Sequence, residues 1–292
     1  MTLDQLIMHE ATRAQLAGFT ASPAHAVLLT GPDGIGKTAL ARALITELLQ
    51  LQPTALDQYP YFTVVAAEER GSISIEAIRE LQKFLQLKTI GSRRLRRAVL
   101  IEHAQGLTTE AQNAYLKLLE EPPADTVMVL TVNSPHALLP TIRSRAQSIA
   151  VHAPTETQLA PLLASSGKEP AVLKQAYFLS SGLPGILCAL IRDDETHPLL
   201  GSVSQAKDIL QKQPFERLAM VETLSKQKEL AKNVLEALER IAEAGLAQAI
   251  ATKEAKRIAQ WHRIRKSVVE TAHALSGSAN TKLALTNLFL HL

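Results

Sequence analysis

The pattern of hydrophobic and polar positions divides the chain near residue 152. Before that point, short apolar runs of strand length alternate with segments whose apolar residues recur at helical spacing. Strands that alternate with helices form a parallel sheet that is covered on both faces. The sequence therefore predicts an α/β domain over residues 1–152, with five parallel strands at residues 26–29, 61–66, 98–101, 127–132 and 148–151.

Helices are predicted between these strands and ahead of the first one. They span residues 3–18, 39–50, 73–87, 108–119 and 136–144. The helix at 108–119 is expected to stop before Pro122 and Pro123, because proline cannot continue a helix.

Beyond residue 152 the strand signal disappears. Thr155 and Gln158 have the spacing of a capping box at the start of a helix. Residues 198–201 are typical of a linker. Residues 203–292 predict four or five helices, broken near Pro214 and at residues 277–278. We therefore predict two all-helical domains, at residues 153–198 and 199–292.

Composition narrows the class of protein. With 46% hydrophobic and 20% charged residues, the 292-residue chain can bury an ordinary core. A formal net charge of +3 is compatible with nucleic-acid partners but does not indicate them. Cys188 is the single cysteine, so no intramolecular disulfide can form. No signal peptide or membrane span is evident, and we expect a cytoplasmic protein without a membrane partner.

The stretch after the first predicted strand has the spacing of a phosphate-binding loop. Gly31 is followed by four residues and then by Gly36-Lys37-Thr38. Lys37 can reach the β- and γ-phosphates of a nucleotide, and the Thr38 hydroxyl can hold Mg²⁺. The sequence predicts a site for ATP or ADP with Mg²⁺, whose loop residues are Gly31, Asp33, Gly34, Ile35, Gly36, Lys37, Thr38 and Ala39.

A second set of polar residues follows two later strands. Glu102 is expected to help hold Mg²⁺, and His103 stands where an ATPase places the carboxylate that activates water. Because losing a general base lowers rates by about 10²–10⁴-fold, we predict binding with weak or absent hydrolysis by the chain alone. Asn133 could contact the lytic water or the γ-phosphate, or it could cap the next turn.

Arginines cluster at two places outside this site. The turn at residues 91–97 carries four of them, which suit either a nucleic-acid phosphate backbone or a solvated turn, and both interpretations stay open. Arg143 and Arg145 follow at the rim of the predicted sheet domain. A surface arginine taken alone is ordinarily solvated.

Several longer stretches resemble bacterial clamp-loader subunits of DNA polymerase III, which are AAA+ proteins. The resemblance rests on residues 24–31, 111–123 and 138–145, and residues 280–290 are similar to the closing helix of the family. This resemblance covers nearly the whole chain. Within the family, the chain resembles the delta-prime type. The resemblance implies an AAA+ domain, a helical lid and a helical collar, which correspond to the three predicted domains.

The resemblance also implies partners and roles. Clamp-loader subunits form a pentameric ring of motor subunits, delta and delta-prime, which loads the sliding clamp on primer–template DNA. Gly31, Gly36, Lys37 and Thr38 match Walker A, Glu102 matches the Walker B aspartate, His103 the catalytic glutamate, and Asn133 sensor 1. Arg145 matches the arginine finger, which reaches into the ATP site of the next subunit.

The sequence departs from the family pattern at several positions. His103 replaces the catalytic glutamate, and Ile186 stands where ATPase-active subunits have an arginine that contacts nucleotide. Ala146 replaces the cysteine of the Ser-Arg-Cys motif, and with Cys188 alone no zinc site is expected. The first two departures fit delta-prime. The alternative is a motor-type, gamma-like subunit that hydrolyses ATP itself.

Overall fold

The computed structural model describes residues 2–67, 72–192, 198–276 and 279–292. The chain separates into two compact units, Met1–Leu159 and Ala160–Leu292. The predicted three-domain division is not tested by this separation, so the lid and the collar remain predictions. In the described part of the chain, no helix combines the length and the apolar character that a membrane crossing requires.

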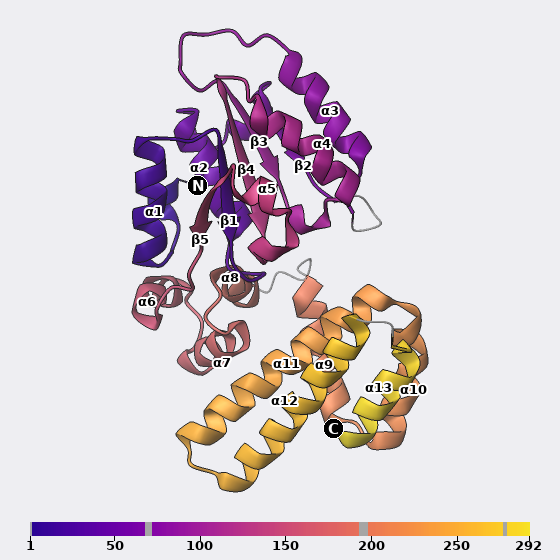
Figure 1. Cartoon of the computed structure of the whole chain (residues 1–292). Coiled ribbons are helices and arrows are strands. Elements are labelled where there is room, and N and C mark those ends of the chain that lie inside the picture. Colours follow the sequence, from indigo (N-terminus) through magenta and orange to yellow (C-terminus); the bar gives the residue numbers. More distant parts are fainter. Residues whose placement is uncertain (1, 68–71, 193–197, 277–278) are drawn as a thin grey trace. The chain divides into compact units, whose positions relative to one another are not determined.

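A five-stranded parallel sheet forms the centre of the first unit (Figure 1), as predicted. Its strands lie in the order β2-β3-β4-β1-β5. The three central strands are buried along their whole length, which explains why they read as continuous apolar runs rather than alternating ones. The strands are β1 (Ala26–Thr30), β2 (Phe62–Val65), β3 (Arg97–Ile101), β4 (Thr126–Val132) and β5 (Gln147–Ala150).

Helices cover both faces of this sheet (Figure 1). On one face lie α1 (Glu10–Ala21) and α2 (Lys37–Leu48), and on the other lie α3 (Ile75–Gln86) and α4 (Thr109–Glu120). Tyr115 of α4 is fully buried in the core between the second pair of helices and the sheet. The fold therefore has the three-layer α/β arrangement that the sequence predicts.

Two predicted helices of this unit differ from the observed ones. Residues 3–18 form a short 3₁₀ turn, Leu3–Gln5, and then α1, which starts only at Glu10 because His9 caps it by accepting a hydrogen bond from the Ala11 amide. Residues 136–144 form a 3₁₀ turn, Pro135–Ala137, and α5 (Pro140–Arg143). Pro140 cannot continue a preceding helix but suits the first position of a new one.

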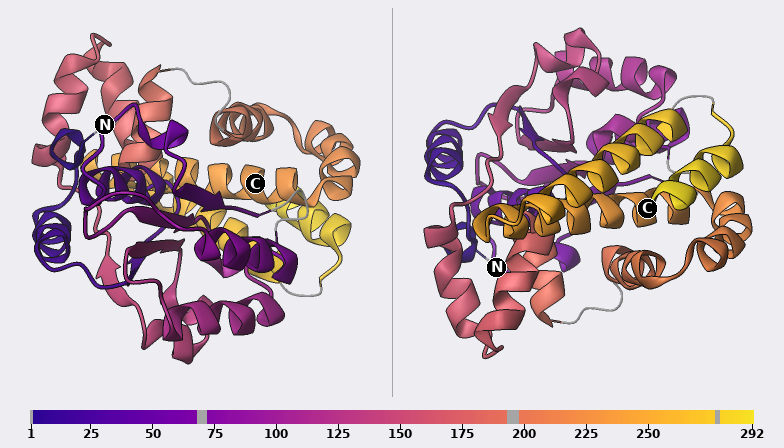
Figure 2. Two further views of the ribbon diagram at one scale, coloured as in Figure 1. Left: turned by 90° about the horizontal axis from the view of Figure 1, so that it is seen from above. Right: turned by 90° about the horizontal axis from the view of Figure 1, so that it is seen from below.

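The second unit contains only helices among its described residues. The long helices α11 (Lys228–Ala251) and α12 (Ala255–Ser276) pack on each other (Figure 2), and α7 (Pro170–Ser180) and α9 (Pro198–Gln211) pack on α11. Its other helices are α8 (Pro184–Arg192), α10 (Pro214–Lys226) and α13 (Thr281–His291), and α6 (Glu156–Ser165) spans the boundary between the units.

The helix starts and helix breaks in the second half of the chain are partly as predicted. The capping box is confirmed, because the Thr155 and Gln158 side chains each accept the other's backbone N–H. A break at Pro214 is confirmed as the start of α10. The linker predicted at residues 198–201 is wrong, because Pro198 begins α9, a position that proline favours. The break predicted at residues 277–278 lies outside the described residues.

One contact between α11 and α12 gives a stability prediction. A methyl group added at Gly245 would overlap the indole ring of Trp261. Overpacking of this kind costs about 1–3 kcal/mol, so we expect Gly245→Ala to lower the free energy of unfolding by that amount. Urea unfolding followed by the fluorescence of Trp261, the single tryptophan, measures the loss.

Gly201 of α9 is the matched control, because an added methyl group would meet nothing within 4 Å there. Gly201→Ala should raise stability by about 0.5–1 kcal/mol, the usual gain of alanine over glycine inside a helix. Equal effects of the two substitutions would contradict the packing described for Gly245.

The turn at residues 91–97 uses most of its arginines internally. Arg97 is 2% exposed, stacks on Phe84 and donates hydrogen bonds to the carbonyl oxygens of Leu85 and Leu87. Arg96 pairs with Asp125 at 3.2 Å, while Arg93 donates to the Leu49 carbonyl oxygen at 2.7 Å. The idea that four arginines face a nucleic-acid backbone is therefore wrong for Arg97, which is part of the core.

Candidate functional site

Parallel pairing brings the residues predicted for nucleotide binding to one edge of the sheet. Thr30, the last residue of β1, is in register with Val132, the last residue of β4, and β3 lies on the other side of β4. The loop from Gly31 follows β1, Glu102 follows β3, and Asn133 follows β4. The carboxyl ends of these three strands therefore present all three segments on the same side.

The loop has the backbone conformation that its glycines permit. Gly36 has φ +95° and caps the N-terminus of α2, and Gly34 has φ +79°, both in the left-handed region that favours glycine. At Gly31, an added methyl group would lie 2.9 Å from the Val151 carbonyl oxygen. Ile35 is buried and anchors the loop to the domain, whereas Ala39 is exposed on α2.

Lys37 is the buried charge of the site, with 5% of its side chain exposed. Its Nζ donates to the carbonyl oxygens of Gly31 at 2.7 Å and Pro32 at 2.9 Å, and to Asn133 Oδ1 at 3.0 Å. Burial lowers the pKa of the Lys37 ammonium group, and the nearby carboxylate of Asp33 opposes this shift. Besides these three neutral oxygens, the ammonium group has one negatively charged partner, the half-exposed carboxylate of Asp33 at 3.6 Å.

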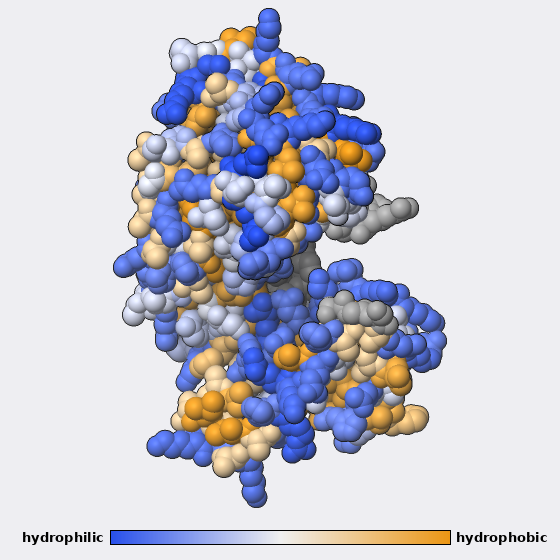
Figure 3. Space-filling view, in the orientation of Figure 1, coloured by the Kyte–Doolittle hydropathy of each residue, from blue (hydrophilic) through white to orange (hydrophobic). Residues whose placement is uncertain are grey.

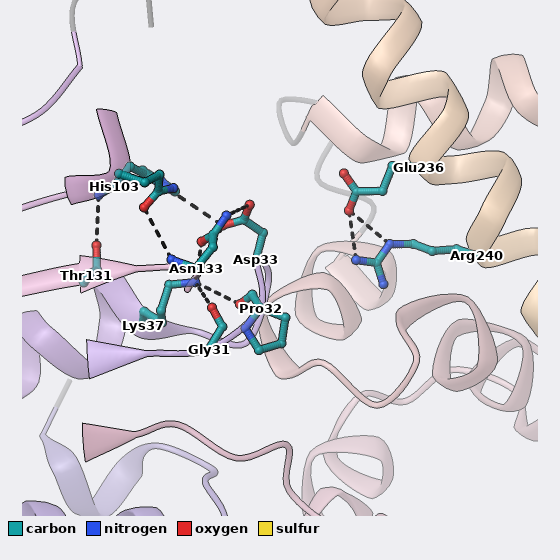
Figure 4. A network of polar contacts seen from close by, with 10 residues as sticks. Gly31, Pro32, Asp33, Lys37, His103, Thr131, Asn133, Glu236 and Arg240 are labelled. Carbon is teal, nitrogen blue, oxygen red and sulfur yellow. Dashed lines mark hydrogen bonds and ion pairs between the residues drawn. The ribbon is translucent and has the colours of Figure 1, made fainter. Parts of the chain in front are cut away.

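Asp33, Asn133 and His103 converge on this lysine (Figure 4). Asp33 Oδ1 lies 3.6 Å from Lys37 Nζ and 3.9 Å from His103 Nδ1. Asp33 Oδ2 accepts a hydrogen bond from Asn133 Nδ2. Asn133 therefore joins the end of β4 to the loop through both the lysine and the carboxylate, rather than capping the next turn.

Two residues that shape the site were not predicted from the sequence. Thr131 Oγ1 accepts the backbone N–H of His103 at 3.0 Å, which supports the left-handed backbone of that residue, φ +50°. Gln105 Oε1 accepts the backbone N–H of Asn133 at 3.4 Å. The available signal for Thr131 was its polarity inside an otherwise apolar strand; nothing in the sequence distinguished Gln105.

Thr38 and Glu102 supply oxygen atoms that are not otherwise used. Neither side chain makes a hydrogen bond or ion pair with the described residues, and both are only half-buried. Hydroxyl and carboxylate oxygens are the donors that Mg²⁺ prefers, so the residues present fit a nucleotide-bound magnesium ion. Over the described ranges, no group of three or more His, Cys, Asp or Glu side chains is placed to hold a metal ion alone.

Arg145 lies apart from the phosphate-binding loop. Its guanidinium group donates to Glu120 Oε1 at 2.9 Å and to the Thr141 carbonyl oxygen at 3.2 Å. The arginine side chain is 37% exposed and its carboxylate partner 52%. An ion pair this exposed contributes only about 0–1 kcal/mol to stability. Arg145 can therefore exchange Glu120 for another partner with little loss of free energy.

Comparisons with known proteins find similar sequences. A family model described as "DNA polymerase III, delta subunit" matches residues 19–155. The DNA polymerase III subunit delta' of Pseudomonas aeruginosa is 37% identical over 193 residues, 60% of this chain. That of Escherichia coli K12 is 31% identical over 187 residues, 58% of this chain. These matches span 58% and 55% of the two relatives' own lengths.

The fold is also shared with a solved structure. The gamma subunit-related protein of Thermotoga maritima superposes with a TM-score of 0.54 at 21% identity, over 96% of this chain and 97% of that one. This likeness shows the AAA+ fold alone. The sequence matches support a bacterial DNA polymerase III clamp-loader subunit of the delta-prime type.

Proposed function

We propose that this chain acts as the delta-prime subunit of a clamp loader. It binds ATP or ADP with Mg²⁺, places Arg145 in the ATP site of a neighbouring motor subunit, and helps to load the sliding clamp on primer–template DNA. Its partners in the pentameric ring are the motor subunits and delta, in the cytoplasm. The observation that carries the proposal is the separation of two charges, since Lys37 is buried in the chain's own site while Arg145 lies outside it.

The side chains of the site suit binding better than hydrolysis. Lys37 and the N-terminus of α2 would neutralise phosphate oxygens, and Thr38 and Glu102 would hold Mg²⁺, which draws charge from the phosphates when bound. His103 has its ring nitrogen 3.4 Å from Gln105 Nε2 and 3.9 Å from Asp33. No carboxylate directly follows Glu102 in the chain, so a water molecule would lack its usual general base.

The exposed side chain of Arg145 suits a role in the ATP site of a neighbouring subunit. The guanidinium group of Arg145 can leave Glu120 for a phosphate, because charge-assisted hydrogen bonds from arginine to phosphate are stronger than an exposed ion pair. Its position after the short helix α5 fixes the backbone, while the side chain keeps over a third of its surface in water.

Two measurements on purified protein test this proposal. We expect the isolated chain to bind Mg²⁺-nucleotide yet hydrolyse ATP no faster than the Lys37→Ala variant. We also expect it to raise ATP hydrolysis when mixed with a motor subunit, and native mass spectrometry should show both chains in one complex with bound nucleotide. Turnover by the isolated chain that Lys37→Ala abolishes would instead support the motor-type alternative.

A further inference from the structure

Asp33 places a negative charge inside the phosphate-binding loop. Its two carboxylate oxygens face the Lys37 ammonium group, the Asn133 amide and the His103 ring (Figure 4). We propose that Asp33 makes this site select a nucleoside diphosphate over a nucleoside triphosphate. The inference rests on the proposed nucleotide binding and names the ligand that the site prefers.

Asp33 contacts the two groups that would bind a terminal phosphate. A γ-phosphate in this loop would draw on Lys37 and on the polar side chain after the neighbouring strand, which is Asn133. Asp33 Oδ2 already accepts the Asn133 amide proton, and Oδ1 lies 3.6 Å from the Lys37 ammonium group. One carboxylate therefore holds the Asn133 amide by a hydrogen bond and lies within ion-pair distance of Lys37.

Electrostatic repulsion by Asp33 also disfavours a triphosphate. A terminal phosphate group carries a charge of about −1.5 to −2 at pH 7. Next to a carboxylate it is repelled, and at Asp33, whose side chain is 53% exposed, the repulsion is that of a partly solvated pair, in which water weakens but does not remove the Coulomb term. A triphosphate must either approach Asp33 or displace it from Asn133 and Lys37.

A diphosphate has no γ-phosphate and therefore avoids this repulsion by Asp33. The α- and β-phosphates are bound mainly by backbone N–H groups of the loop and by the N-terminus of the following helix. Here these are the residues around Gly36 and the start of α2 at Lys37, which remain available beside Asp33. The diphosphate therefore keeps these backbone contacts without removing the carboxylate, and it shares only Lys37 with Asp33.

Isothermal titration calorimetry on the full chain tests the proposal, with MgADP and with the Mg²⁺ complex of a non-hydrolysable ATP analogue. The wild-type chain should bind MgADP about tenfold more tightly than the analogue. The isosteric variant Asp33→Asn should bring the two affinities within about threefold, mainly by tighter binding of the analogue. Asp57→Asn is the control, because Asp57 is an exposed carboxylate paired with Arg42 in the same unit.

Each other outcome has a distinct meaning. Equal affinities in the wild-type chain, or equal changes for both ligands in Asp33→Asn, would overturn the inference and leave nucleotide binding intact. A uniform loss of affinity would overturn the inference in the same way and would show that Asp33 helps to hold Mg²⁺. If the wild-type chain binds neither ligand, the proposed nucleotide binding itself fails, and the inference fails with it.

Discussion

Arg145→Ala is expected to abolish the stimulation of ATP hydrolysis in a partner motor subunit. Arginine fingers supply about 10³–10⁵-fold in phosphoryl-transfer enzymes by stabilising the charge of the transition state. Removal of the guanidinium group should therefore lower the stimulated rate by about 10³-fold or more while leaving complex formation unchanged. Steady-state ATP hydrolysis by the reconstituted complex gives the rate, and native mass spectrometry of the same sample gives the composition.

Two further variants make this result specific to Arg145. Glu120→Gln removes the charge that holds the guanidinium group and should keep or raise the stimulation. Arg79→Ala removes an exposed arginine of α3, paired with Glu76 at 3.5 Å, and should leave it unchanged. If Arg145→Ala complexes hydrolyse ATP at the wild-type rate, the proposed role in trans is wrong.

A second large effect is expected for stability, at Arg97. Replacement by alanine leaves the carbonyl oxygens of Leu85 and Leu87 without their donor and opens a cavity beside Phe84. The Leu85 carbonyl is buried, and a buried polar group left unpaired costs about 1–3 kcal/mol. Removal of buried side-chain volume adds to this loss. We expect Arg97→Ala to lower the free energy of unfolding by about 3–5 kcal/mol, comparable to breaking a buried ion pair.

Arg94 provides the matched control for this substitution. It lies in the same turn but is exposed, so Arg94→Ala should change stability by less than about 0.5 kcal/mol. Urea unfolding followed by circular dichroism, with the transition of the α/β unit fitted separately, compares the two variants. Similar midpoints for both would show that the Arg97 contacts do not stabilise the domain.

The sheet could be predicted because its strands are buried on both faces. Burial requires continuous apolar runs, which stand out in the sequence and end at chemically distinct residues such as Gly31, Glu102 and Asn133. The rule that parallel strands end at one edge then brings those residues together. The face seen in Figure 3 is mostly hydrophilic, with apolar side chains in groups between the polar ones, which fits the same patterning.

Other features could not be predicted because they depend on distant partners. The sequence shows four similar arginines at residues 91–97, yet only the position of Arg97 at the start of β3 turns it into the core. The start of α1 depends on His9, an uncommon cap, so periodicity alone placed it too early. Asp33 was expected as a loop residue, whereas its contacts with Asn133 and His103 need the registered strands.

The register of β1 has a consequence for synthesis of the chain on the ribosome. Thr30 pairs with Ala150 on one side and with Val132 on the other. At translation rates of about 5–20 residues per second, β1 waits roughly 6–24 seconds for the 120 residues that separate Thr30 from Ala150. Until β4 emerges this apolar strand has no partner, and until β5 emerges one of its edges stays open, so the nascent chain offers a binding segment to general chaperones during that interval.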